Sequence, residues 1–207
     1  LFFKPEYLSK LKSCGVSVLD SATEVVPAAM HYLGKPAFSR NIGDYAGALP
    51  LLKSIRPYVT LFSSSGYIND LANGSLCLSM GYSGDINIAR ARAIEAKNGV
   101  KLEALIPEKG ATLFFDSMAI PADAPHPKNA LKFINYILDK DIHSWAVDNI
   151  LYKVPNKAAM EKSLPALIGA YPNMGMSPAD LLKGEGLLDL GAAAPLYTRI
   201  ATEVTAG

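Results

Sequence analysis

The chain has 207 residues, half of them hydrophobic, with 20 Lys and Arg against 19 Asp and Glu. This length suits one large domain or two small lobes, and the hydrophobic content can fill a core. The balanced charges offer no basic face for nucleic acid, and no apolar run reaches the roughly 20 residues that a membrane-spanning helix needs. The chain begins without Met, in a stretch that resembles the middle of a longer sequence, so we expect a processed or truncated product.

Strand and helix patterns alternate through the first hundred residues. Strands are predicted over 16–20, 58–62 and 75–80, and helices over 5–13, 21–34, 49–55, 66–74 and 83–99. The run 75–80 is nearly all apolar, as expected for a strand covered on both faces. Ser21 and Glu24 fit a capping box at the start of 21–34, although Pro27 suggests that this helix begins later. The alternation predicts an α/β fold with a largely parallel sheet.

The pattern changes after residue 100. Two strand-like runs, 100–107 and 112–121, flank the turn "EKG". A helix is predicted over 126–140, where apolar residues recur at helical spacing and indicate one buried stripe. The stripe contains Ala130, Phe133, Ile134, Ile137 and Leu138. Further helices are predicted over 141–149, near 177–183 and over 192–204.

The cysteines and histidines give no metal signature, and we expect neither a metal nor a cofactor. Cys14 and Cys77 lie outside any CxxC motif, and the three histidines are scattered. Two free buried thiols and a Cys14–Cys77 disulfide both remain open at this point. The disulfide would imply an oxidising compartment.

A carboxylate stands beside aromatic residues at two predicted strand ends. Asp85 follows Tyr82, and Asp116 follows Phe114 and Phe115. A cationic ligand that leaves water needs carboxylates for its charge, and aromatic faces attract cations and cover methylene groups. Open α/β sheets bind ligands at such strand ends.

Other interpretations of these residues also stand. Asp85 could complement only its own helix N-terminus, the two phenylalanines could be core, and Glu24 could be only a capping partner. Asp85 and Asp116 could also form the carboxylate pair of a glycosidase. "SSSG" is not a nucleophile elbow, and "GYSG" lacks the Lys of a phosphate-binding loop.

Several longer stretches resemble the periplasmic polyamine-binding proteins, the putrescine- and spermidine-binding components of ABC importers. They are "LKSCGVSVLDSATEVV", "PYVTLFSSSGYINDLANG", "CLSMGYSGDINIARARAIEAKNGVK", "IPEKGATLFFDSMAIPADA" and "YKVPNKAA". The resemblance implies a two-lobe α/β periplasmic binding protein fold of type II, present as a C-terminal portion that lacks the N-terminal part. Residues 1–100 and 173–207 would form most of the second lobe, and 101–172 the C-terminal half of the first.

The resemblance also implies a ligand site between the lobes and a disulfide between Cys14 and Cys77. Carried over position by position, the ligand-binding residues are Glu24, Ser64, Tyr82, Asp85, Phe114, Asp116 and Tyr152. Tyr82 replaces the Trp that the family usually has, which keeps an aromatic wall but reduces its area.

By this resemblance the protein is not an enzyme. It is expected to be a periplasmic monomer that binds a polyamine and delivers it to a membrane permease, with no nucleic-acid partner. The alternatives are a carboxylate-based hydrolase on a similar two-lobe scaffold, or a polyamine sensor without a transport role.

Overall fold

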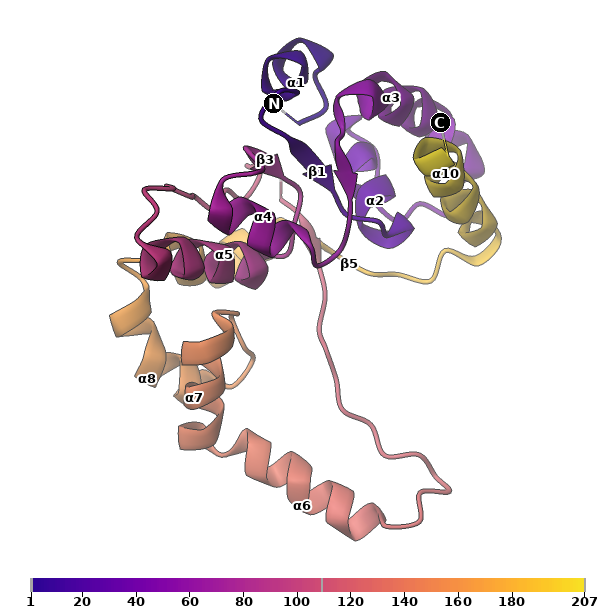
Figure 1. Cartoon of the computed structure of the whole chain (residues 1–207). Helices are drawn as coiled ribbons and strands as arrows, with labels where there is room; N and C mark the ends of the chain where they lie inside the picture. Colours follow the sequence, from indigo (N-terminus) through magenta and orange to yellow (C-terminus); the bar gives the residue numbers. More distant parts are fainter. Residues whose placement is uncertain (1, 109, 207) are drawn as a thin grey trace.

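The computed structural model describes residues 2–108 and 110–206 (Figure 1). The helices are α1 (Pro5–Leu11), α2 (Ala22–Tyr32), α3 (Ala48–Ile55), α4 (Tyr67–Asn73), α5 (Ser83–Ala96), α6 (Pro127–Leu138), α7 (Lys140–Ile150), α8 (Lys157–Leu167), α9 (Pro178–Leu181) and α10 (Ala194–Ala206). The strands are β1 (Val16–Val18), β2 (Leu61–Phe62), β3 (Leu78–Ser79), β4 (Thr112–Leu113) and β5 (Glu185–Gly186). In this part of the chain, no helix is both long enough and apolar enough to cross a membrane.

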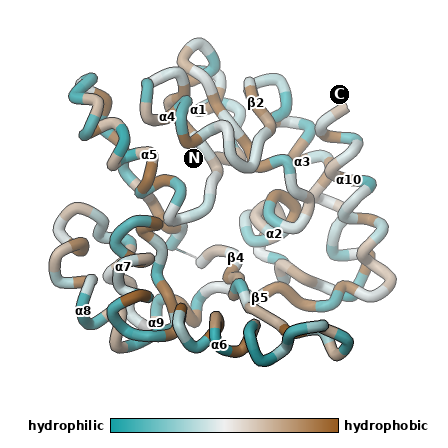
Figure 2. The backbone as a smooth tube through the Cα atoms, turned by 60° about the horizontal axis from the view of Figure 1, so that its bottom comes forward, coloured by the Kyte–Doolittle hydropathy of each residue, from teal (hydrophilic) through white to brown (hydrophobic). Residues whose placement is uncertain are grey.

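A three-stranded parallel sheet organises the first half of the chain. β1 lies in the centre, with β2 on one side and β3 on the other. The main core surrounds this sheet and contains side chains from α2, α3 and α4. The C-terminal helix α10 returns to the same core and packs against α2 and α3, so that these three helices lie together on one side of the molecule (Figure 2). The predicted alternation of strands and helices and the parallel sheet are confirmed.

A disulfide joins Cys14, just before β1, to Cys77, just before β3. The two Cα atoms lie 5.7 Å apart, and the Cys77 N–H donates a hydrogen bond to the Gly15 carbonyl. The bridge therefore links the entrances of two adjacent strands. The pairing implied by the family resemblance is confirmed, and the free-thiol interpretation is wrong.

A second, smaller core lies under α7 and α8. Its buried side chains are Val147, Leu151, Met160, Tyr171 and Met174, and Ile88 and Ala91 of α5 pack against it. Helix α5 thus contributes to both cores, because Ala89 belongs to the main one. The buried Asn87 side chain donates a hydrogen bond of 3.0 Å to the Leu151 carbonyl. The end of α7 is therefore fixed against α5.

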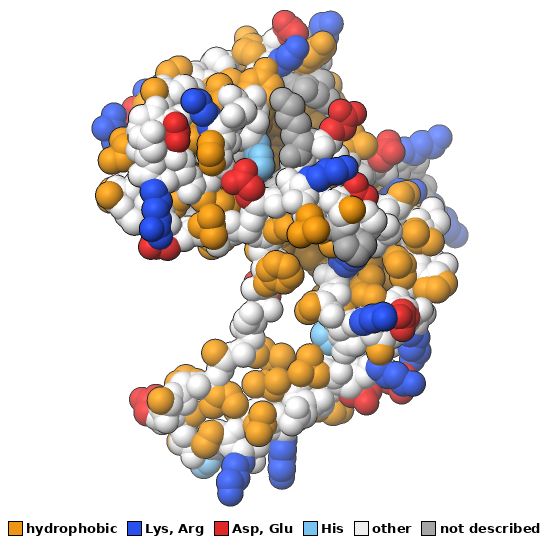
Figure 3. All heavy atoms as spheres, turned by 180° about the vertical axis from the view of Figure 1, so that it is seen from behind, with side chains coloured by type: hydrophobic (Ala, Val, Ile, Leu, Met, Phe, Trp, Pro, Cys, Tyr) orange, Lys and Arg blue, Asp and Glu red, His pale blue; other side chains and the backbone are white. Residues whose placement is uncertain are grey.

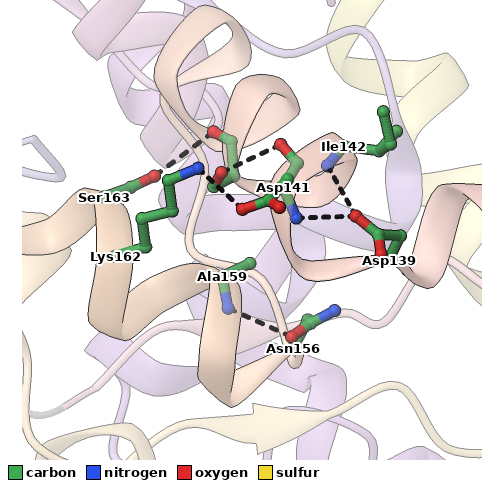
Figure 4. A network of polar contacts seen from close by, with 8 residues as sticks. Asp139, Asp141, Ile142, Asn156, Ala159, Lys162 and Ser163 are labelled. Carbon is green, nitrogen blue, oxygen red and sulfur yellow. Dashed lines mark hydrogen bonds and ion pairs between the residues drawn. The ribbon is translucent and has the colours of Figure 1, made fainter.

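Polar side chains hold α7 and α8 together (Figure 4). The Asp139 carboxylate accepts from the N–H groups of Asp141 and Ile142 and caps α7, while the Asn156 side chain accepts from the Ala159 N–H and caps α8. Lys162 of α8 pairs with Asp141 of α7 at 2.8 Å. Both caps satisfy backbone donors that have no partner inside the helix. The connection between these helices, which carries Tyr152, is held at its start by the bond of Asn87 to the Leu151 carbonyl and at its end by the Asn156 cap.

The prediction of a strand over 100–107 is wrong. This run has no strand among the described residues, and in the second run only β4, Thr112–Leu113, forms one. β4 pairs with the distant β5 in a separate two-stranded parallel sheet. A strand exists only where a neighbour accepts its backbone hydrogen bonds. The sequence pattern shows that the side chains suit a strand, but it does not show whether a neighbouring strand is present to pair with.

The predicted buried stripe on α6 is also wrong. The helix forms where expected, but it contains no buried residue, and Phe133 and Leu138 are 59% and 50% exposed. Figure 3 shows hydrophobic side chains gathered along the arm of the molecule that α6 forms. α6 packs against α7 through a limited contact. Helical spacing therefore identified the apolar face of α6, but no other described element buries that face.

Two finer predictions need correction. α2 begins directly after Ser21 and contains Pro27, so its start is not displaced. Ser21 occupies the N-cap position without making a capping hydrogen bond, because its hydroxyl pairs with Thr23. The strand expected over 75–80 is reduced to β3, whose two residues are only half-buried rather than covered on both faces.

Candidate functional site

The carboxyl-terminal edge of the three-stranded sheet brings polar residues together. Because β1, β2 and β3 are parallel, their following loops leave the sheet at the same edge. These loops carry Asp20 after β1, Ser64 after β2 and Tyr82 after β3. The Ser64 hydroxyl donates a hydrogen bond to the Asp20 carboxylate. Asp20 was not predicted as a site residue, although its place at the end of the predicted strand 16–20 was a usable signal.

Asp85 lies in the first turn of α5, at the same edge, and is held by two tyrosines. The hydroxyl of Tyr67 on α4 donates to Oδ2 of Asp85, and the hydroxyl of Tyr152 donates to Oδ1, both at 2.7 Å. The Tyr67 hydroxyl also accepts the backbone N–H of Tyr82 at 3.0 Å. Three separate segments therefore converge on one half-buried carboxylate. Tyr67 was missed at the sequence level, where "YINDLANG" indicated a short helix and contributed to the family resemblance without marking Tyr67 as a site residue.

Two glycines of the stretch "MGYSGD" make room for these tyrosines. A Cβ on Gly81 would lie 2.5 Å from Cε2 of Tyr67, and a Cβ on Gly84 would lie 1.9 Å from Cδ2 of Tyr152. Neither separation is compatible with ordinary carbon–carbon contact of about 3.5 Å. Both rings thus pack directly on the backbone that leads into Asp85.

The tyrosine hydroxyls remain protonated at neutral pH and act as donors. Burial, followed by the hydrogen bond to Asp85, raises the pKa of Tyr67 and that of Tyr152 above the ordinary value. Burial also raises the pKa of Tyr82, and the negative charge of Glu24 raises it further. Asp85 is therefore the acceptor in both hydrogen bonds, and Glu24 lies close enough to Tyr82 to act on it electrostatically.

An aromatic pair borders the carboxylate cluster. The rings of Tyr82 and Phe114 meet edge to face, with centroids 5.5 Å apart and planes at 78°. Phe114 is 46% exposed and Phe115 is 77% exposed, so neither is a core residue, and that interpretation is wrong. The pair leaves aromatic surface accessible beside Asp85.

The structure brings most of the predicted site residues together but leaves Asp116 apart. Asp85 contacts Tyr152, Tyr82 contacts Phe114, and Tyr67 connects these two pairs. Glu24 acts on Tyr82 by charge, as does Asp20, which accepts a hydrogen bond from Ser64. Asp116 follows β4 and is exposed, and within the described residues it makes no side-chain hydrogen bond or ion pair. Its role remains a prediction.

Chemically, the cluster suits a cation. A carboxylate can accept about four hydrogen bonds, and the two tyrosines use two of those of Asp85. Asp85, Glu24 and Asp20 all act electrostatically on Tyr82, whose ring meets that of Phe114, so three carboxylates lie near aromatic surface that favours cations. Asp85 lies in the first turn of α5, where its charge complements the helix N-terminus. Its two side-chain hydrogen bonds go to tyrosines outside α5, so complementing its own helix is not its only contact.

Comparison with known proteins gives consistent matches. A family model described as bacterial extracellular solute-binding protein matches residues 6–162. The putrescine-binding periplasmic protein SpuD of Pseudomonas aeruginosa is 50% identical over 176 residues, which are 84% of this chain and 48% of the relative. The putrescine-binding periplasmic protein PotF of Escherichia coli is 49% identical over 160 residues, 77% of this chain and 43% of the relative. This chain spans about half the length of these curated relatives.

Solved structures support the same fold. A putative spermidine/putrescine ABC transporter from Listeria monocytogenes superimposes with a TM-score of 0.81 at 25% identity, covering 99% of this chain and 60% of that one. The Tp0655 lipoprotein of Treponema pallidum gives a TM-score of 0.75 at 24% identity, covering 98% of this chain and 60% of that one. The predicted α/β binding-protein fold is confirmed. From the match to more than half of its residues and the identity to these relatives, the chain belongs to the family of bacterial extracellular solute-binding proteins.

Proposed function

We propose that this chain belongs to the substrate-binding component of an ABC importer that binds putrescine- or spermidine-type polyamines. The observation that carries the proposal is the Asp85 carboxylate, oriented by Tyr67 and Tyr152 and bordered by the Tyr82–Phe114 pair. An ammonium group has three donors and needs oxygen acceptors close by. Asp85 retains free acceptor positions, and the aromatic pair offers surface for methylene groups.

The relatives support a binding role and the type of ligand. SpuD and PotF are named for binding putrescine in the periplasm, and both are about half identical to this chain. Their names favour binding over the alternative of a carboxylate-based hydrolase. The Listeria monocytogenes structure, a putative spermidine/putrescine ABC transporter, favours a transport role over a separate sensor role. The Cys14–Cys77 disulfide fits an oxidising compartment such as the periplasm.

We propose further that the site lies between two lobes. Residues 1–100 with 173–207 would form most of one lobe, and 101–172 would form half of the other. The main core, which combines residues 8–89 with 190–204, supports this division, as does the separate core under α7 and α8. Tyr152 would then reach Asp85 across the boundary between the lobes. Asp116, on the segment that follows β4, would bind the second ammonium group.

Calorimetry on the full-length protein with putrescine and spermidine tests the proposal. Asp85→Asn and Asp116→Asn should each weaken binding at least about thirtyfold, because loss of one partner of a desolvated charge pair costs roughly 2–5 kcal/mol. Asp148→Asn is the matched control, since it removes the same charge from an exposed position on α7 and should leave affinity unchanged. Unchanged affinity in both site variants would refute the proposed polyamine site.

A further inference from the structure

One buried tyrosine hydroxyl connects two residues of the candidate site. Tyr67 on α4 is 0% exposed, and its hydroxyl donates to the Asp85 carboxylate while it accepts the backbone N–H of Tyr82. We infer that Tyr67 is a positioning residue for polyamine binding: it fixes the direction of Asp85 and the backbone of Tyr82 at the start of α5. The inference rests on the proposed function.

The start of α5 explains why a hydroxyl is needed there. Tyr82 is the N-cap residue and makes no side-chain cap, and the N–H groups at a helix start have no acceptor within the helix. Asp85 is the third residue of α5. In a capping box, the side chain at this position reaches back to the N–H of the N-cap residue. A direct bond of that kind would turn the carboxylate toward its own helix.

Tyr67 replaces that direct bond. Its hydroxyl accepts a hydrogen bond from the Tyr82 N–H at 3.0 Å and donates one to Oδ2 of Asp85 at 2.7 Å. The hydroxyl of Tyr152 donates a hydrogen bond to the other carboxylate oxygen of Asp85, Oδ1. The carboxylate is thereby held away from the N-cap backbone by two donors from other segments. Its remaining acceptor positions are kept for a ligand, and its orientation depends on Tyr67.

The backbone of this stretch is adapted to the Tyr67 ring. A Cβ on Gly81 would lie 2.5 Å from Cε2, 2.8 Å from Cζ and 2.9 Å from the hydroxyl oxygen of Tyr67. Gly81 does not have a positive φ, so space is what this position requires of glycine. Gly81 and Tyr67 therefore form one unit, and either can be changed to displace the hydroxyl.

Calorimetry with putrescine on the full-length protein tests the inference through two independent variants. Tyr67→Phe removes the hydroxyl and keeps the ring, whereas Gly81→Ala keeps the hydroxyl and pushes the ring away. Each should weaken putrescine binding about tenfold or more. Should Tyr67→Phe fail to fold, Gly81→Ala reports on the same contact.

Two controls match these variants in chemistry. Tyr45→Phe removes another buried hydroxyl, which donates to the Ser39 carbonyl at 2.6 Å in the main core. Gly169→Ala adds a methyl group where no atom lies within 4 Å. Both should bind putrescine as the wild-type protein does, even where Tyr45→Phe lowers the melting temperature.

A double-mutant cycle separates positioning from general stability. In the Asp85→Asn background, Tyr67→Phe should weaken binding much less than in the wild-type background, because Tyr67 acts through Asp85. Equal weakening in both backgrounds would overturn the inference. So would wild-type affinity in both Tyr67→Phe and Gly81→Ala, while the proposed function would stand. Absence of putrescine and spermidine binding by the wild-type protein would instead refute the proposed function.

Discussion

Replacement of Gly84 by alanine should damage both stability and ligand binding. The added methyl group would lie 1.9 Å from Cδ2 and 2.1 Å from Cε2 of Tyr152. Ordinary carbon–carbon contact is about 3.5 Å, so the ring must move by roughly 1.5 Å. The 2.7 Å hydrogen bond from Tyr152 to Asp85 cannot survive a displacement of that size in the direction away from α5.

The expected loss of stability combines two unfavourable contributions and one favourable contribution. A hydrogen bond to a charged group contributes about 1.5–3 kcal/mol, and overpacking typically costs about 1–3 kcal/mol. Alanine favours a helix over glycine by about 1 kcal/mol, which offsets part of this loss. We therefore expect the free energy of unfolding of Gly84→Ala to fall by about 2 kcal/mol or more. Putrescine affinity should fall about tenfold or more, because Asp85 loses one of its two orienting donors.

Denaturant unfolding and calorimetry on the full-length protein measure these two effects. Gly186→Ala is the control, since a methyl group there meets no atom within 4 Å. Adding Tyr152→Ala to Gly84→Ala should recover part of the stability by removing the clash, but should not recover affinity. If Gly84→Ala were as stable as the wild-type protein and bound putrescine equally well, the packing of Tyr152 on α5 would be refuted.

Three further predictions concern other parts of the chain. Thiol titration of the unfolded, unreduced protein should find no free thiol, and loss of the Cys14–Cys77 bridge, which spans 63 residues, should lower the free energy of unfolding by about 4 kcal/mol in denaturant titrations; two reactive thiols would refute this. Tyr82→Trp should maintain or improve putrescine affinity in calorimetry, because the larger ring covers more of the methylene chain; a marked loss would exclude Tyr82 from the ligand wall. Phe133→Ala should cost less than about 1 kcal/mol in unfolding experiments on this chain, because the ring is exposed; a loss of about 3–5 kcal/mol would show that α6 is covered.

Local signals in the sequence predicted most helices and the order of elements. The helix over 83–99 was placed by its first-turn residues and its terminal Asn-Gly, and α5 forms there with Lys97 as its C-cap. The apolar face of α6 was also identified correctly. Its burial was not, because helical spacing specifies which face is apolar and leaves open what packs on it. The same reason explains 100–107, whose side chains suit a strand that finds no pairing neighbour among the described residues.

The candidate site, like the fold, could be predicted only where the signal was local in sequence. Asp85 could be identified because a carboxylate beside an aromatic residue after an apolar strand is a local pattern. Of its two donors, Tyr67 was missed and Tyr152 was identified only through the family resemblance, because they lie 18 and 67 residues away in sequence and reach Asp85 only through the packing of α4 and of the α7–α8 connection.

Even so, the two glycines of "MGYSGD" carried part of this information. Glycine at the second position of α5 has a low helix propensity, so helix propensity alone gives no reason for it to be there. In the structure it is the space for the Tyr152 ring, as Gly81 is the space for Tyr67. A glycine that opposes the local preference beside a candidate ligand residue therefore indicates that another side chain must approach there. In this chain, those approaching side chains decide where the Asp85 carboxylate points.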